Sequence, residues 1–295
     1  MRPFVDRPVV DRDAAAAVAT RQAAAWGLGS LRLVRHGMNS LYVADGVVLR
    51  VGVSTAPAAA AQALVRWLLD AGVPTVTPVD GLADDVDGFA VTGWHAVREV
   101  RRAIDWRAVG AAVRLVHTLD PASVPDGYPV PEPTGFPWWQ FDALVDELAD
   151  DLDHRAKAGL TAALARHRGW QDRVRRDAVL CHGDVHPGNV LMSGAGPLLI
   201  DWDLLCVAPV AWDHAMLTTL ASRWGGGEHV YADFAAGYGR SLVDDDLTLA
   251  LAELRNVAAT LLRVRAGRTD PSAAAEAERR LAYWRGDSEA PWTAQ

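Results

Sequence analysis

Apolar and polar residues alternate in the first third of the chain, as they do in short β-strands. Within residues 40–52, Asp45 and Gly46 separate two apolar runs. An Asp-Gly pair suits the type I′ turn of a two-residue loop, so a β-hairpin is predicted here. Two further strands are predicted at residues 75–79 and 88–92, on either side of an acidic turn. The N-terminal part is therefore predicted to contain a small sheet.

The rest of the pattern is mainly helical, with apolar residues three and four positions apart. Helices are predicted at residues 13–26, 58–70, 106–119 and 138–153, and over most of the chain after residue 210. The helix at 58–70 is expected to stop at Gly72, because Val73 and Pro74 follow it. Residues 121–137 carry six prolines and are predicted to form a loop. A small α+β part is thus followed by a mainly helical one.

Two polar segments interrupt these apolar runs and share one kind of chemistry. Residues 180–190 read LCHGDVHPGNV, and residues 198–203 read LLIDWD. Protein kinases carry the same Asp-to-Asn spacing in their catalytic loop, followed by a second Asp that binds metal. Asp184 is therefore predicted to orient an acceptor hydroxyl and take its proton. Asn189 and Asp201 are predicted to bind Mg²⁺, which prefers oxygen ligands.

The other polar side chains of these segments are predicted to support the loop. These residues are His182, His186 and Asp203. Imidazole is not a preferred Mg²⁺ ligand, so the two histidines are expected to brace the loop.

The motifs HGDxHxxN and IDW resemble those of the aminoglycoside phosphotransferase family and its choline kinase and homoserine kinase relatives. The resemblance implies a two-lobed, protein-kinase-like α+β fold. A small β-rich N-terminal lobe, residues 1–93, would cover the nucleotide. A larger, mainly helical C-terminal lobe, residues 94–295, would carry the catalytic and acceptor-binding residues. ATP or GTP would be the co-substrate with Mg²⁺, and a small-molecule alcohol, such as an aminoglycoside or amino sugar, the acceptor.

The resemblance also implies which residues face the nucleotide. They are Gly37, Ser40, Arg50, Thr92 and Trp94. Gly37 and Ser40 lie in the turn before the hairpin, where backbone N–H groups would meet phosphate oxygens. Backbone groups near Thr92 and Trp94 would contact the edge of the base.

Arg50 occupies the position of the strand lysine of protein kinases, and a guanidinium can bind phosphate oxygens bidentately. The relatives place a glutamate on the next helix to pair with this cation, but this chain has Ala61 and Gln62 there. The partner of Arg50 is therefore left open, as is a solvent-facing role for this arginine.

Acidic residues gather on one face of the helix predicted at 138–153. Asp142 and Asp146 lie on this face, opposite the apolar residues. With Trp138 and Asp213 they form the candidate acceptor pocket, which would attract a cationic acceptor. The alternative is that this face is only solvated.

Composition narrows the classes of function. The chain has 295 residues, a net charge of −8 and a pI near 5.6, which argues against a nucleic-acid partner. A signal-peptide core and a membrane-spanning apolar run are both missing from the sequence, and two cysteines do not make a disulfide framework. A cytoplasmic monomer or homodimer is expected.

Two alternatives stay open. His182, Asp184 and His186 could bind Zn²⁺ or Mn²⁺ in a metal-dependent hydrolase, although this leaves Asn189 and the IDWD segment unexplained. The missing helix glutamate could instead indicate a nucleotide-binding module with little or no turnover.

Overall fold

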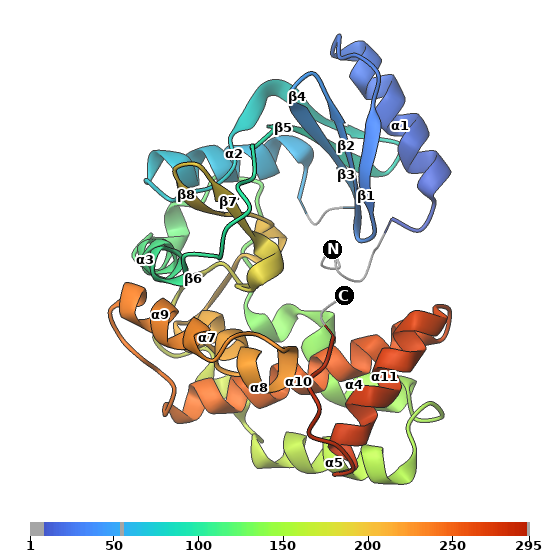
Figure 1. The fold of residues 1–295 in the computed structure, drawn as a ribbon, viewed down its shortest axis with the longest axis vertical. Helices are drawn as coiled ribbons and strands as arrows, with labels where there is room; N and C mark the ends of the chain where they lie inside the picture. Colours follow the sequence, from blue (N-terminus) through green and yellow to red (C-terminus); the bar gives the residue numbers. More distant parts are fainter. Residues whose placement is uncertain (1–8, 54–55, 294–295) are drawn as a thin grey trace.

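The computed structural model describes residues 9–53 and 56–293, and its N-terminal part is built on an antiparallel sheet. In the described residues this sheet has five strands in the order β1-β2-β3-β5-β4. The strands are β1 (Arg32–His36), β2 (Asn39–Ala44), β3 (Val47–Gly52), β4 (Pro78–Val86) and β5 (Phe89–His95). Helices α1 (Arg12–Ala25) and α2 (Ala58–Asp70) pack against it (Figure 1).

The hairpin predicted from Asp45 and Gly46 is confirmed. β2 pairs with β3 on either side of these two residues, and both have positive φ angles, 50° and 77°, as a type I′ turn requires. The helix predicted at residues 58–70 has those bounds, and Gly72 after it has a φ of 84°.

The acidic turn predicted between two strands is wrong. Residues 80–86 belong to β4, and the chain reverses only at Asp87 and Gly88, a second Asp-Gly pair with positive φ angles. β4 is an edge strand, so several of its acidic side chains face solvent. Charges of this kind protect a sheet edge from pairing with another chain.

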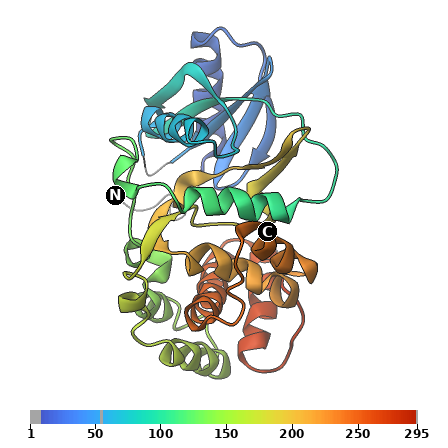
Figure 2. The same ribbon diagram turned by 90° about the vertical axis from the view of Figure 1, so that its left-hand side faces the viewer.

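The C-terminal part is mainly helical. Its helices are α3 (Trp106–Val116), α4 (Phe141–Glu147), α5 (His154–Arg166), α6 (Trp170–Arg173), α7 (Ala211–Thr218), α8 (Leu220–Trp224), α9 (His229–Tyr238), α10 (Asp246–Gly267) and α11 (Pro271–Trp284). Two small antiparallel ribbons accompany them: β6 (Ala178–Cys181) with β9 (Cys206–Pro209), and β7 (Val190–Ser193) with β8 (Gly196–Leu199). Figure 2 shows α3 crossing between the sheet above and the helices below. The two-lobed α+β architecture is therefore confirmed.

The single helix predicted at residues 138–153 is wrong. Only α4 forms there, and α5 starts immediately after Asp153. The carboxylate of Asp153 accepts hydrogen bonds from the backbone N–H groups of Arg155 and Ala156, so it caps a new helix and ends the earlier segment.

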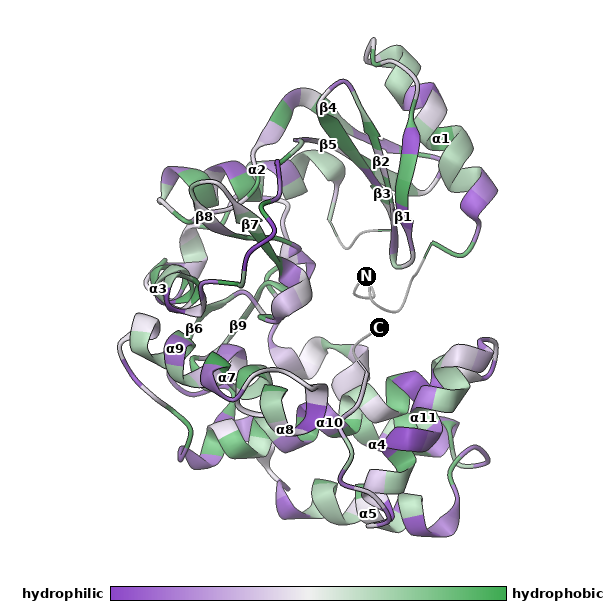
Figure 3. Ribbon diagram, in the orientation of Figure 1, coloured by the Kyte–Doolittle hydropathy of each residue, from purple (hydrophilic) through white to green (hydrophobic). Residues whose placement is uncertain are grey.

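The linker between the lobes runs beside one of the ribbons. β5 continues to His95, two residues past the lobe boundary predicted after residue 93. The division into lobes at this residue stays a prediction. After it, the N–H of Val100 donates to the Met192 carbonyl at 2.7 Å, and Arg102 donates to the Ser193 carbonyl at 3.0 Å. Figure 3 shows this linker as largely hydrophilic, in contrast to the central strands of the sheet.

Three apolar clusters hold these elements together. One joins α1 to the sheet through residues such as Leu49 and Val51. A second joins α2 of the upper lobe to α3 and the small ribbons, with Leu64 and Leu199 buried in it. The third fills the helical lobe. The second cluster fixes the small ribbons, and the loops that follow their strands, between the lobes. Among the described helices, none is long and apolar enough to cross a membrane.

Candidate active site

The segment HGD begins where β6 ends, and its glycine is required by the backbone. Gly183 has a φ of 90°, a left-handed conformation that favours glycine. A Cβ at this position would also clash with the carbonyl oxygen of Leu204. The tight turn brings Asp184 directly after the strand and packs the loop against the IDWD segment.

Asp213, from the first turn of α7, holds the backbone of this loop. Its carboxylate accepts hydrogen bonds from the N–H groups of His182 and Gly183, both at 2.8 Å, and lies 3.0 Å from Nε2 of His117. Nδ1 of His117 lies 2.9 Å from the hydroxyl of Tyr238. Burial alone would raise the pKa of Asp213, but the hydrogen bond and charge of His117 lower it.

The assignment of Asp213 to the acceptor pocket is therefore wrong. The residue is 1% exposed, and both of its carboxylate oxygens are already bonded inside the protein. Its role is to support the loop.

Asp184 and Asn189 face each other across the loop. The Asn189 amide nitrogen donates to the Asp184 carbonyl at 2.9 Å and to Asp184 Oδ2 at 3.1 Å. Nε2 of His186 lies 3.3 Å from the same Oδ2. Burial would raise the pKa of Asp184, but His186, Arg255 and His182 hold it well below its usual value. The carboxylate is therefore ionised at neutral pH.

The rings of His182 and His186 each accept a hydrogen bond from a backbone N–H of the loop. The buried His182 ring lies 3.1 Å from the Ile200 carbonyl through Nε2 and accepts from the Asp184 N–H at 3.3 Å through Nδ1. Burial lowers the pKa of His182. Burial alone would also lower the pKa of His186, but the carboxylate of Asp184 raises it.

The hydrolase alternative is not favoured by this geometry. Both ring nitrogens of His182 are engaged by the backbone, so His182, Asp184 and His186 do not converge as metal ligands. Within the described residues, the compact group with metal-ligand chemistry is instead His117, Cys181 and Asp213. Its His and Asp are already hydrogen-bonded to each other and to the loop, so we interpret it as structural.

Asp201 follows β8 and comes to the same end of the β7–β8 ribbon as Asn189. The N–H of Ile200 donates to the Asn189 carbonyl at 3.0 Å, which ties the two segments together. Asp201 has a φ of 65°, a strained conformation for a non-glycine residue, and strain of this kind often marks functional sites. Its Oδ1 atom is buried without a hydrogen-bond partner. A buried carboxylate oxygen without a hydrogen-bond partner is suited to bind a cation.

Asp203 is the partner of Arg50 that sequence reasoning left open. The Arg50 guanidinium forms a close ion pair with Asp203 and lies 3.9 Å from Asp201. Burial and the nearby negative charge of Asp201 raise the pKa of Asp203 to about 6, although the positive charge of Arg50 acts in the opposite direction. Gln62 does not replace the helix glutamate, because its amide donates to the carbonyls of Leu82 and Gly93.

The other predicted nucleotide residues lie on the sheet beside Arg50. Thr92 is directly opposite Arg50 in the β3–β5 pair, and its hydroxyl accepts from the Trp94 indole at 2.9 Å. Gly37 is exposed in the β1–β2 turn, but its N–H already donates to the Asn39 carbonyl. Ser40 is fully buried, and its hydroxyl bonds Nδ1 of His36. Contact of any of these residues with a nucleotide stays a prediction.

Of the predicted acceptor residues, Trp138 is buried, whereas Asp142 and Asp146 are exposed. Trp138 is 8% exposed and stacks on Phe136 in the core of the helical lobe, so it offers little surface to an acceptor. Asp142 and Asp146 lie on the exposed face of α4. Neighbouring carboxylates of this helical region, Glu147 and Asp151, are paired with Arg268. Part of the negative charge on this face is therefore neutralised.

Sequence reasoning missed Arg255, which reaches the loop from α10. Its guanidinium donates to the Gly183 carbonyl at 2.6 Å. A lone arginine on a long amphipathic helix carries no motif, so no local signal could have identified it.

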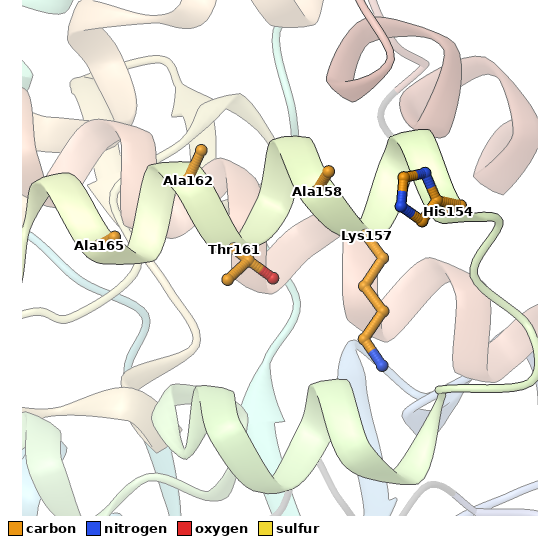
Figure 4. A pocket seen from close by; sticks show the side chains of 6 residues that line it. All are labelled: His154, Lys157, Ala158, Thr161, Ala162 and Ala165. Carbon is orange, nitrogen blue, oxygen red and sulfur yellow. The ribbon is translucent and has the colours of Figure 1, made fainter.

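A surface hollow of about 480 Å³ does not coincide with these residues. Its lining side chains all belong to α5 (Figure 4). A single helix face does not enclose a ligand, so we do not interpret it as a site.

The fold is similar to that of several solved structures. Spectinomycin phosphotransferase, in complex with ADP and spectinomycin, superposes with a TM-score of 0.66 at 17% identity, covering 87% of this chain and 89% of that one. APH(2″)-IIia, in complex with GDP and kanamycin, gives 0.67 at 17% identity, covering 92% and 99%. A choline/ethanolamine kinase family protein from Mesorhizobium loti gives 0.62 at 19% identity, covering 93% and 95%. Identities this low show a shared fold.

The family comes from the sequence itself. None of the curated proteins matches this chain. The model of the phosphotransferase enzyme family matches residues 42–255, which include β3, β4 and β5 of the sheet, both motifs and Arg255. The chain therefore belongs to the phosphotransferase enzyme family and is a small-molecule kinase.

Proposed function

We propose that this kinase transfers the γ-phosphoryl group of ATP or GTP to a hydroxyl of a small, amine-bearing molecule. The observation that carries the proposal is the arrangement of Asp184 beside two oxygen donors, Asn189 and Asp201, at one end of the β7–β8 ribbon. The nucleotides in the similar structures, ADP and GDP, support either co-substrate.

In this proposal Asp184 binds the acceptor hydroxyl. Its Oδ2 atom is engaged by Asn189 and His186, which leaves Oδ1 to accept the hydroxyl hydrogen. As the acceptor oxygen bonds to the γ-phosphorus, the bond to the bridging oxygen breaks and its electron pair leaves with the nucleoside diphosphate. The proton passes to Asp184. A carboxylate with a low pKa is a weak base, so its main contribution is orientation of the hydroxyl.

Asn189 and Asp201 would hold Mg²⁺ with the nucleotide phosphates. The fit rests first on Oδ1 of Asp201, which is buried without a hydrogen-bond partner and lies 3.9 Å from the Arg50 guanidinium. It rests also on the Asn189 amide, whose nitrogen donates to Asp184 and leaves the amide oxygen for a cation. Mg²⁺ would supply neutralisation of charge on the phosphate oxygens. Arg50 would add a guanidinium to the same phosphates, in exchange for part of its pairing with Asp203.

Asp201→Ala should weaken Mg²⁺-dependent nucleotide binding, because it removes the anionic ligand of the cation. Calorimetric titration of nucleotide with and without Mg²⁺ measures this directly. Asp126→Asn, on an exposed loop, is the control and should bind as the parent does. If Asp201→Ala binds Mg²⁺-nucleotide with the parent's affinity and stoichiometry, this residue is not a metal ligand. Tight, stoichiometric binding of Zn²⁺ by the parent would favour a hydrolase.

The amine on the acceptor is proposed from charge. Asp142 and Asp146 are exposed on α4, the chain is acidic overall, and two similar structures hold spectinomycin and kanamycin. The proposed acceptor is an aminoglycoside or an amino sugar.

The acceptor KM should rise with added salt, because dissolved ions screen the attraction between exposed carboxylates and a cationic acceptor. Asp146→Asn should also raise KM, as should Asp150→Asn at an exposed acidic position just after α4, whereas Asp126→Asn should not. Steady-state kinetics with an identified acceptor over a salt series make the test. A KM independent of salt and of both substitutions would show that this face is only solvated, and would leave the phosphoryl transfer standing.

A cytoplasmic enzyme acting as a monomer or homodimer completes the proposal. The two cysteines support a reducing compartment. Cys181 and Cys206 are opposite each other in the β6–β9 ribbon, yet both are free thiols and both are buried.

A further inference from the structure

One arginine contacts the catalytic loop from outside both motifs. Arg255 lies in α10, and its side chain is 14% exposed. Its Nη2 atom donates to the Gly183 carbonyl at 2.6 Å, and its Nη1 atom lies 3.8 Å from Asp184 Oδ1. The guanidinium also lies over the Trp212 ring, 4.9 Å from its centroid. Three contacts therefore fix its position against the loop.

The burial of this cation has a cost that its contacts only partly offset. Nε of Arg255 is buried without a hydrogen-bond partner, and leaving a buried donor unsatisfied is unfavourable. Two arginines at the C-terminal end of α10 form ion pairs at the surface instead: Arg268 with Glu147 and Asp151, and Arg265 with Glu147. A buried arginine with an unsatisfied donor, placed beside the carboxylate of Asp184, indicates a role in function rather than in stability alone.

The two oxygens of Asp184 are treated differently by their surroundings. Oδ2 receives Asn189 and His186, whereas Oδ1 faces Arg255 at a distance beyond a hydrogen bond. We propose that Arg255 is a positioning residue, which locks the Gly183–Asp184 peptide and orients Asp184 so that Oδ1 meets the acceptor hydroxyl. This inference rests on the proposed function of Asp184.

The shape of the group matters as much as its charge. A planar guanidinium can donate to a carbonyl, face a carboxylate and stack on an indole at the same time, whereas an ammonium is a compact point charge. Lysine at this position is therefore expected to keep the charge but lose the orientation.

The test compares Arg255→Ala, Arg255→Lys and the control Arg21→Ala, which removes an exposed cation of α1 that pairs with Asp87. Transfer is measured with an identified acceptor, or as nucleotide hydrolysis with water as acceptor. For Arg255→Ala we expect kcat to fall by about 10²-fold, as for a misplaced reactive group, with nucleotide affinity unchanged. Arg255→Lys should remain impaired, and Arg21→Ala should match the parent.

Chemical rescue separates positioning from general stability. Millimolar guanidinium should restore part of the kcat of Arg255→Ala by binding over Trp212, whereas urea, which is planar but neutral, should not. Thermal unfolding checks that each variant is folded, and if the alanine variant is not, the lysine variant decides. Parental kcat in the folded variant, equal rescue by urea, or a loss of nucleotide affinity in place of kcat would overturn the inference. A parent that neither binds Mg²⁺-nucleotide nor consumes it would instead refute the proposed function.

Discussion

Asp184→Asn should bind nucleotide with parental affinity and lose roughly 10² to 10⁴ of its turnover. The substitution is nearly isosteric, so the loop held by Asp213 and Arg255 should keep its shape. The amide cannot take the acceptor proton, and it removes the negative charge that orients the hydroxyl. The measurement is kcat with an identified acceptor, beside calorimetric nucleotide affinity.

The control for this variant is Asp126→Asn, the same chemical change on an exposed loop, which should leave both quantities unchanged. Comparable turnover in Asp184→Asn and the parent would exclude Asp184 as the group that binds and deprotonates the acceptor hydroxyl. A loss of nucleotide affinity equal to the loss of turnover would make it part of the nucleotide site instead.

Asp213→Asn should destabilise the protein and stop turnover, although Asp213 does not touch the reacting groups. The carboxylate accepts from two backbone N–H groups and lies beside His117, and an amide nitrogen cannot accept. Removing one partner from a buried hydrogen-bonded charge pair costs about 3–5 kcal/mol. Urea unfolding should show this loss of free energy of unfolding, and kcat should fall because the HGD turn is no longer fixed.

His117→Gln serves as a milder companion, because it removes one partner and leaves both backbone bonds to Asp213 in place. It should lose less stability than Asp213→Asn. If Asp213→Asn unfolds at the parent's urea midpoint with full turnover, the support that α7 gives to the loop is not needed.

Local sequence signals predicted much of this structure. Asp45-Gly46 predicted the β2–β3 hairpin, and the stop at Gly72 predicted the end of α2. The spacing of Asp184 and Asn189 placed both residues in one short loop, and their hydrogen bond was found only in the structure. Two similar local signals explain the wrong element bounds. Asp87-Gly88 is a second Asp-Gly turn, which places the chain reversal after residue 86, and Asp153 is a helix cap, which divides the helix predicted at residues 138–153.

The partners that come from distant elements could not be predicted. Asp203 replaces a helix glutamate only because the fold brings the segment after β8 against β3. His117, Asp213 and Arg255 come from three different parts of the helical lobe, and their convergence depends on how those helices pack. Burial decided the remaining cases, since Trp138 looked available in a proline-rich segment and instead packs in the core.

Whether Asp184 directs a γ-phosphoryl group to an alcohol is decided by the identity of the phosphorylated product. The parent is incubated with Mg²⁺ and ATP or GTP labelled with ¹⁸O on the γ-phosphate, together with a panel of hydroxylated amines, and products are read by mass spectrometry. We predict a labelled phosphate monoester of one panel member, absent with Asp184→Asn. Label found only in inorganic phosphate, at a rate that neither the alcohols nor Asp184→Asn change, would contradict this role of Asp184.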